Sequence, residues 1–243
     1  MKVSKVSRLR AALAPLSILA ASACGASAPP PKPPEPAPVP QDHGADLSGM
    51  KMHGDLGLID KEETDQTLHG LSPAFQKCQT DRLEDVAVLS GAVKFFIRVG
   101  ENGMARFAYF EASDLGDRVA EKCMLDAITA TQFPKPEGGE AEVRYGIELP
   151  QHSERVPDSW SADKVADAKS AAESCTSGAS STAQVTAYVV ADDTRKKGGK
   201  ALAVGVAFPE EGSDGKIDCI VKAVKAAKLP SPGSFVAKVS FSL

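Results

Sequence analysis

The sequence predicts an α+β fold made of two tandem copies of a helix–strand–strand–helix–strand unit. Each copy is expected to be a small three-stranded sheet with two helices on one face and one disulfide inside the domain. Two cysteines and a proline recur at matching intervals of 45 or 44 and then eleven residues, at Cys78, Cys123 and Pro134 and again at Cys175, Cys219 and Pro230. Each proline leads at the same offset into an alternating apolar run, which comprises Val143, Tyr145 and Ile147 or Val239, Phe241 and Leu243. Repeated spacing of this kind indicates repeated structural units.

The first copy begins with a predicted helix over residues 60–83. Four side chains recur there at helical spacing and mark one buried face: Leu68, Leu71, Phe75 and Cys78. A strict alternation of apolar and polar residues predicts a strand over 93–99. The segment 100–103 contains the glycines and asparagine of a hairpin turn, so a return strand is expected over 104–111.

The second helix of the first copy is expected to begin after Asp114, whose side chain suits an N-cap position. Its predicted buried face carries Val119, Cys123 and Ala127. The prolines in 133–136 end this helix, and a third strand follows over 143–149.

The second copy repeats this order with smaller side chains. Its first helix carries apolar residues at the spacings of the first copy: Val165, Ala168, Ala172 and Cys175. Strands are expected at about 184–191 and 201–208, a helix at about 216–228, and a last strand over 235–243. Because alanine replaces leucine and phenylalanine, the core of this copy is expected to be smaller and to depend more on its disulfide.

Four cysteines besides Cys24 suggest disulfides in an exported protein. Four cysteines allow three pairings, and the repeat selects the one within each copy, which joins Cys78 to Cys123 and Cys175 to Cys219. Each closed loop of this length would stabilise the fold by about 4 kcal/mol in the chain-entropy model. No Cys-x-x-Cys occurs, so a thioredoxin-like redox site and a zinc ribbon are not supported.

Residues 1–23 are predicted to be a lipoprotein signal peptide. A positive segment precedes an apolar run over 11–23 that is too short to span a bilayer, and its charges come from Lys2, Lys5, Arg8 and Arg10. The run ends in Ala21-Ser22-Ala23-Cys24, which resembles a bacterial lipobox. That resemblance implies cleavage before Cys24 and its lipidation, and Gly25 at the next position favours the outer membrane. An ordinary secretory signal that leaves Cys24 as a free thiol is the alternative.

Residues 24–46 are predicted to be a proline-rich tether. Eight prolines lie between positions 29 and 40, a composition typical of a semi-rigid polyproline II spacer. A ligand for an aromatic groove on a partner is the alternative interpretation. The two copies then occupy 47–150 and 151–243.

The charge balance argues against a nucleic-acid partner. Removal of residues 1–23 would take away four positive charges, so the formal net charge of −4 would become −8. Nucleic-acid binding requires a basic surface to neutralise phosphates. The partners expected for this chain are therefore proteins and, through a lipid anchor, a membrane.

The first copy also carries a distinctive set of cysteines, glycines, prolines and strand residues: Cys78, Gly91, Val93, Phe95, Ile97, Gly103, Cys123, Phe133, Pro134, Pro136, Gly138, Gly139, Val143 and Tyr145. This pattern resembles the AgmX/PglI C-terminal domain, a TonB C-terminal-like group found in lipoproteins. The resemblance covers about residues 50–150. The second copy lacks the double glycine, so its membership depends mainly on the internal repeat.

The resemblance implies a function in binding. TonB C-terminal domains bind short segments of outer-membrane receptors by adding a strand to an exposed sheet edge. A lipid anchor in place of an inner-membrane helix excludes energy transduction from what the resemblance implies. It implies a periplasm-facing adaptor module that binds an envelope protein or peptide strand, in an envelope or motility complex.

No motif of a known catalytic site is present, so we expect neither an enzyme nor a cofactor. A copper-binding lipoprotein is the alternative function. Thioether and imidazole ligands suit cuprous copper, and four such residues lie close together: His43, Met50, Met52 and His53. The alternation of Met50 and Met52 is equally typical of the inward face of a short strand, with the histidines in solvent.

Overall fold

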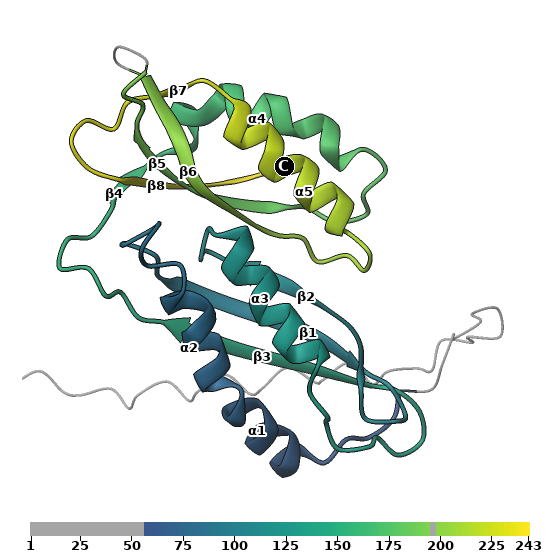
Figure 1. The fold of residues 1–243 in the computed structure, drawn as a ribbon. Helices are drawn as coiled ribbons and strands as arrows, with labels where there is room; N and C mark the ends of the chain where they lie inside the picture. Colours follow the sequence, from purple (N-terminus) through teal and green to yellow (C-terminus); the bar gives the residue numbers. More distant parts are fainter. Residues whose placement is uncertain (1–55, 195–197) are drawn as a thin grey trace, which may run out of the picture. The chain divides into compact units, whose positions relative to one another are not determined.

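The computed structural model describes residues 56–194 and 198–243 (Figure 1). The signal peptide, the proline-rich tether and the candidate copper ligands lie outside these residues. Lys51–Leu243 form one compact unit. The unit has an α+β fold with two sheets and two disulfides, as the sequence predicts at this coarse level.

The first half contains a three-stranded antiparallel sheet in the order β2-β1-β3. Its elements are α1 (Lys61–Gly70), α2 (Ser72–Thr80), β1 (Gly91–Val99), β2 (Ala105–Ser113), α3 (Arg118–Thr129) and β3 (Ala141–Leu149). The three helices lie over the same face of this sheet (Figure 1).

The helix predicted over 60–83 is two helices in the structure. Asp60 caps α1 by accepting a hydrogen bond from the Glu63 amide at 2.8 Å. The break falls at Leu71, and Pro73 lies in the first turn of α2, where a missing N–H costs nothing. Two short helices, α1 and α2, therefore take the place of the one long helix that was expected.

The predicted cap and buried face of the second helix were both wrong. The N-cap of α3 is Asp117, which accepts a hydrogen bond from the Ala120 amide at 2.8 Å. Asp114 instead accepts from the Ala92 amide. Of the predicted stripe, Val119 is 56% exposed and Cys123 is exposed, and only Ala127 packs against the core. The stripe that α3 buries consists of Ala120, Glu121, Met124 and Ile128. This neighbouring stripe is favoured because α3 packs against strands of both halves.

The second half contains a five-stranded sheet in the order β4-β8-β5-β6-β7, where three strands were expected. Its strands are β4 (Asp158–Trp160), β5 (Gln184–Ala191), β6 (Gly198–Ala207), β7 (Leu229–Pro230) and β8 (Ala237–Ser242). Its helices are the 3₁₀ turns η1 (Ala162–Val165) and η2 (Ser174–Thr176) with α4 (Ala166–Glu173) and α5 (Asp214–Ala226). The two unexpected strands, β4 and β7, span three and two residues. Segments this short carry no detectable periodicity.

Strand β1 has the alternation that the sequence predicts on its helix-facing side. Four side chains there are at most 2% exposed: Val93, Phe95, Ile97 and Val99. Phe96 points to the other face and is also buried. The Tyr109 ring stacks on it at 4.8 Å, and the Arg144 guanidinium lies 4.9 Å from its centroid. Aromatic and arginine side chains therefore cover part of the face that no helix covers.

The central strand β5 of the second sheet is buried on both faces. Val185, Ala187 and Val189 of β5 belong to the core under α4 and α5. Tyr188, from the opposite face of β5, belongs to the core of the first half, and its hydroxyl donates to the Ser90 carbonyl at 3.1 Å. The two halves therefore share a core within one compact unit.

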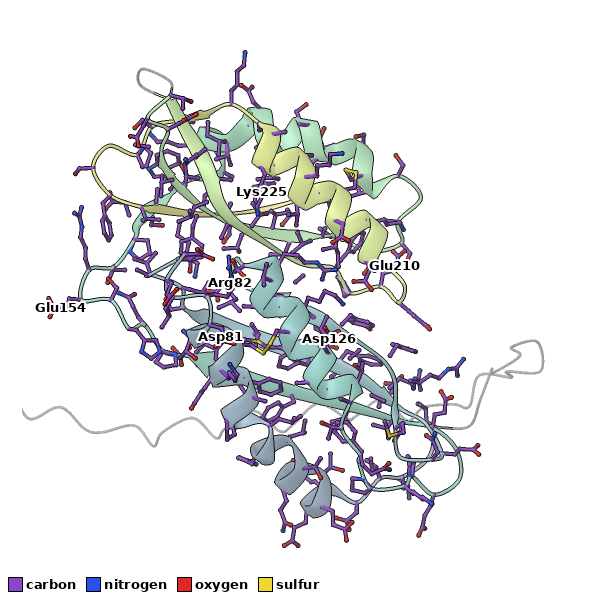
Figure 2. All side chains as sticks on the ribbon, in the orientation of Figure 1. Asp81, Arg82, Asp126, Glu154, Glu210 and Lys225 are labelled. Carbon is purple, nitrogen blue, oxygen red and sulfur yellow. A yellow bond between two sulfur atoms is a disulfide. The ribbon has the colours of Figure 1, made fainter. Side chains whose placement is uncertain are left out.

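The structure confirms both predicted disulfides. Cys78 is joined to Cys123 and Cys175 to Cys219, each with Cα atoms 5.7 Å apart. The first bridge links α2 to α3 and the second links η2 to α5, and both are drawn in yellow in Figure 2. In each pair the first cysteine is buried and the second is exposed, so the bridges close the outer side of the helix pairs.

Candidate functional site

The strands at the sheet edges differ greatly in length. β4 and β7, which end the second sheet, span three and two residues, whereas β2 and β3, which end the first sheet, span nine each. A long edge strand presents a row of backbone N–H and C=O groups that are available to another chain. We refer to the outer side of β3, Ala141–Leu149, as the β3 edge.

The second half covers the other long strand sides in this part of the chain. Residues 200–207 of β6 extend beyond β7, and the Val206 amide there donates to Oε2 of Glu121 on α3 at 2.9 Å. Glu121 is fully buried and also accepts from the Ser113 hydroxyl at 2.8 Å. Strand β2 packs against β6. β2, the other nine-residue edge strand of the first sheet, therefore has a neighbour along part of its length, and we take the β3 edge as the candidate binding surface.

Burial of Glu121 affects the ionisation of its carboxyl group at the contact between the two halves. Loss of solvent raises the pKa of its carboxyl group, although the hydrogen bonds from Ser113 and Val206 and the nearby Arg118 act in the opposite direction. Arg118 in turn pairs with Asp214 at 2.6 Å and Asp218 at 3.1 Å on α5. Polar contacts thus hold α3 to the second half and leave the β3 edge on the opposite side of the first sheet.

The helix-facing side chains of the β3 edge are incompletely covered. Tyr145 and Ile147 are each only half-buried, although the residues paired with them on β1, Phe95 and Val93, are fully buried. The His69 ring of α1 contacts Tyr145 edge-on at 6.3 Å. An added strand alongside β3 would bury more of Tyr145 and Ile147.

A hollow of about 250 Å³ lies between α2 and the end of β3, and its lining residues are Ser72, Phe75, Gln76, Ile147, Glu148, Leu149 and Pro150. Phe75 is fully buried and stacks on Phe95 with centroids 5.4 Å apart. Ile147 contributes a half-buried apolar wall, and Glu148 and Gln76 are exposed at the rim. The hollow therefore suits one apolar side chain of a peptide that runs along the β3 edge.

Gln79 fixes the end of the β3 edge. Its side chain is fully buried, and its Nε2 donates to the carbonyls of Leu89 at 2.8 Å and Pro150 at 2.7 Å. Its Oε1 has no hydrogen-bond partner among the described residues. Sequence reasoning missed this residue, because a glutamine beside a cysteine on a helix gives no sign of burial.

The segment leading into α1 occupies the region just before β3. The Gly57 amide donates to the Glu140 carbonyl at 2.8 Å, and the Leu58 amide donates to the Glu137 carbonyl at 2.9 Å. A Cβ atom on Gly57 would lie 2.5 Å from the Gly139 carbonyl oxygen, so the close approach requires glycine. From Ala141 onward, β3 pairs with β1 alone within the described residues.

The other predicted site residues divide into two groups. The four cysteines of the disulfides are where the sequence places them. Cys24 and the candidate copper ligands His43, Met50, Met52 and His53 lie outside the described residues. Within residues 56–194 and 198–243, no three side chains of histidine, cysteine or acidic type gather as metal ligands do. No helix in these ranges has the length and apolar character needed to cross a bilayer.

No protein-family model, no curated protein and no solved structure matches this chain.

Proposed function

We propose that this chain is a non-catalytic lipoprotein of the outer membrane that faces the periplasm and binds an envelope protein. Binding occurs by strand addition at the β3 edge. The observation that carries the proposal is a nine-residue edge strand with half-buried Tyr145 and Ile147 beside a hollow of about 250 Å³. The lipid anchor on Cys24 holds this adaptor at the membrane.

An extended peptide suits this surface better than a helix or a small molecule does. Its backbone would pair with the outward N–H and C=O groups of β3, which gives affinity. Alternate side chains of the peptide point to one face, so one of them would enter the hollow beside Phe75 and its neighbours would cover Tyr145 and Ile147. Specificity then comes from the apolar residues at alternate positions.

We also propose that the two halves are divergent copies of a TonB C-terminal-like unit. In each half the first long strand is central: β1 lies between β2 and β3, and β5 lies between β6 and β8. Each half also has one disulfide that joins its helices across 45 or 44 residues. The short strands β4 and β7 flank this common arrangement in the second half only. The second copy, whose sheet ends in the short strands β4 and β7, supports the first copy. The first copy, which has the β3 edge, binds the partner.

The two disulfides support a place in the cell envelope. Disulfides form and persist in oxidising compartments such as the periplasm and are rare in the cytosol. Together with the lipobox-like sequence that ends at Cys24, they favour an exported and membrane-anchored protein.

Site-specific photo-crosslinking in intact cells tests strand binding. A photoreactive amino acid at the exposed Gln76, on the rim of the hollow, should yield one discrete adduct. The same amino acid at the exposed Lys222 of α5 should not. Mass spectrometry of the adduct should locate the crosslink in a short segment with alternating apolar residues.

A charged substitution on the β3 edge provides the second test of strand addition. Ile147→Glu places a carboxylate where an added strand would bury it, so the Gln76 adduct should disappear. Gly146→Glu is the matched control, because its side chain lies on the opposite face and a Cβ atom there meets only the Val93 carbonyl at 3.7 Å. An adduct that survives Ile147→Glu in a protein with unchanged thermal unfolding would contradict strand addition at this edge.

A further inference from the structure

A second cleft, of about 390 Å³, lies where β4, β8 and two loops of the first half meet, and it shares no lining residue with the hollow beside β3. Its lining residues are Ser90, Asp114, Gln151, Val156, Pro157, Ser159, Trp160, Lys238 and Ser240. We refer to it as the Lys238 cleft. Both halves contribute to it, so it exists only in the folded unit.

Lys238 supplies a cation that is largely removed from water. Its side chain is 22% exposed, and its Nζ donates to the Ser90 carbonyl at 2.9 Å. The Tyr188 ring centroid lies 5.5 Å from the same nitrogen. Burial lowers the pKa of the ammonium, which shows that the group is poorly hydrated. An ammonium has three N–H donors, and one of them has a protein acceptor within the described residues.

Asp114 balances this charge only in part. Its Oδ2 lies 3.8 Å from Nζ of Lys238, which is beyond hydrogen-bond distance, and its other carboxylate oxygen accepts from the Ala92 amide. N–H donors of Lys238 therefore remain for a ligand. One ammonium beside one engaged carboxylate suits a singly charged anion better than a phosphate.

The rest of the cleft offers an apolar surface and a free hydroxyl. Val156 is 67% exposed, one of four large apolar side chains with high exposure in the described residues, and Pro157 is half-exposed beside it. The Ser159 hydroxyl has no hydrogen-bond partner among the described residues. A charged group on one side and apolar side chains on the other are typical of sites for small organic ligands.

We propose that the Lys238 cleft binds a small organic monocarboxylate with an apolar body. Lys238 holds the carboxylate by charge-assisted hydrogen bonds, with Ser159 as a second donor. The apolar body lies against Val156 and Pro157. The site is separate from the β3 edge, so it would give the protein a small-molecule function in addition to protein binding.

Calorimetric titration of the full chain with hexanoate tests this proposal directly. Hexanoate should bind saturably at one site, and butanoate should bind more weakly because it covers less apolar surface. Hexanamide, which has the same body without the charge, should bind about tenfold more weakly.

Two sets of variants keep the interpretation specific. Lys238→Met retains the apolar stem and should abolish the preference for hexanoate over hexanamide. Val156→Asp places a like charge at the rim and should weaken hexanoate binding about tenfold. Val119→Asp is its matched control, since this other exposed valine lies on α3 outside the cleft.

The outcomes that overturn the proposal are equally defined. An absence of saturable binding by hexanoate, measured by calorimetry, would reject a monocarboxylate site. Equal affinity for hexanoate and hexanamide would reject the role of Lys238. If Lys238→Met does not fold, the pair Val156→Asp and Val119→Asp decides, because both side chains are exposed. Equal effects of these two substitutions would place the ligand elsewhere.

Discussion

The two halves of this protein have the same order of main elements and one disulfide each, but their sheets differ in burial and in the length of their edge strands. The first sheet has helices on one face, an aromatic and arginine-rich surface on the other, and a long edge strand, β3. The second sheet has a central strand, β5, that is buried on both faces, and it ends in the short strands β4 and β7. The same strand arrangement therefore serves as a potential binding surface in one half and as a buried support in the other.

The sizes of the helix side chains in the core also differ between the two halves. The first helix pair packs Leu68 and Phe75 into its core, whereas α4 packs Ala168 and Ala172. The second sheet compensates by contributing Tyr188 to the core of the first half. The comparison indicates that the smaller second core is stable because it is attached to the first.

Removal of a disulfide should have the largest effect on the free energy of unfolding, and this effect should be equal for the two bridges. The loops are of nearly equal length, with separations of 45 and 44 residues, so replacing either cysteine pair by serine should lower the free energy of unfolding by about 4 kcal/mol. Denaturant unfolding should remain a single transition, because the halves share a core. A fluorescence transition of Trp160, in the second half, that precedes the transition seen by circular dichroism would show that the second half unfolds alone.

A side chain at Gly205 should break the contact between the halves. A Cβ atom there would lie 2.3 Å from Oε1 of Glu121, so Gly205→Val should displace a buried carboxylate and destabilise the fold by about 3 kcal/mol. Gly146→Val on β3 is the matched control, because its surroundings are open, and it should cost less than about 1 kcal/mol. Similar losses for both variants in thermal unfolding would mean that the halves are not closely packed at Gly205.

The buried carboxyl of Glu121 should make stability depend on pH. Burial raises its pKa in the folded chain, so the folded state holds the proton more tightly than the unfolded chain does. Its contribution to stability is complete below the ordinary glutamate pKa and is lost as the pH rises through the raised value. Glu121→Gln does not titrate, so its stability relative to the native chain should increase as the pH rises above the ordinary glutamate pKa of about 4.3.

Denaturant unfolding of Glu121→Gln and of the native chain, measured side by side at a series of pH values, gives this difference in stability. A Glu121→Gln variant that instead loses stability relative to the native chain as the pH rises would contradict the assignment.

The Tyr188 hydroxyl should have the smallest effect. It donates to the Ser90 carbonyl at 3.1 Å and accepts from the Ser90 amide at 3.3 Å, so Tyr188→Phe should lower the free energy of unfolding by about 1 kcal/mol. Tyr145→Phe on the β3 edge, whose ring is half-exposed, should be nearly neutral. Equal changes in denaturant midpoint would show that the bond to Ser90 does not link the halves.

Features that depend on local pattern were predictable from the sequence. The alternation over 93–99 marks β1 because one face of this strand is wholly apolar, and the repeat of spacings selects the disulfide pairing. The buried face of α3 was not predictable, because it depends on packing against the second half. Strands as short as β4 and β7 also give no periodic signal.

The candidate site divides in the same way. The strand over 143–149 was expected, but its position at the edge depends on pairing between distant strands, which the sequence does not encode locally. Gln79 and Glu121 were missed because a single polar residue on a helix normally faces solvent. Lys238 gave no signal either, since its surroundings come from both halves.

Residue-resolved amide hydrogen exchange of the full chain tests the central claim, that β3 is the open edge, most directly. Alternate amides along β3 should exchange rapidly, because they point away from β1 and have no partner in the described chain. The Val206 amide of β6 should exchange slowly, since Glu121 accepts its hydrogen bond. Slow exchange along the whole of β3, equal to that of β1, would mean that this edge is already covered and would contradict strand addition there.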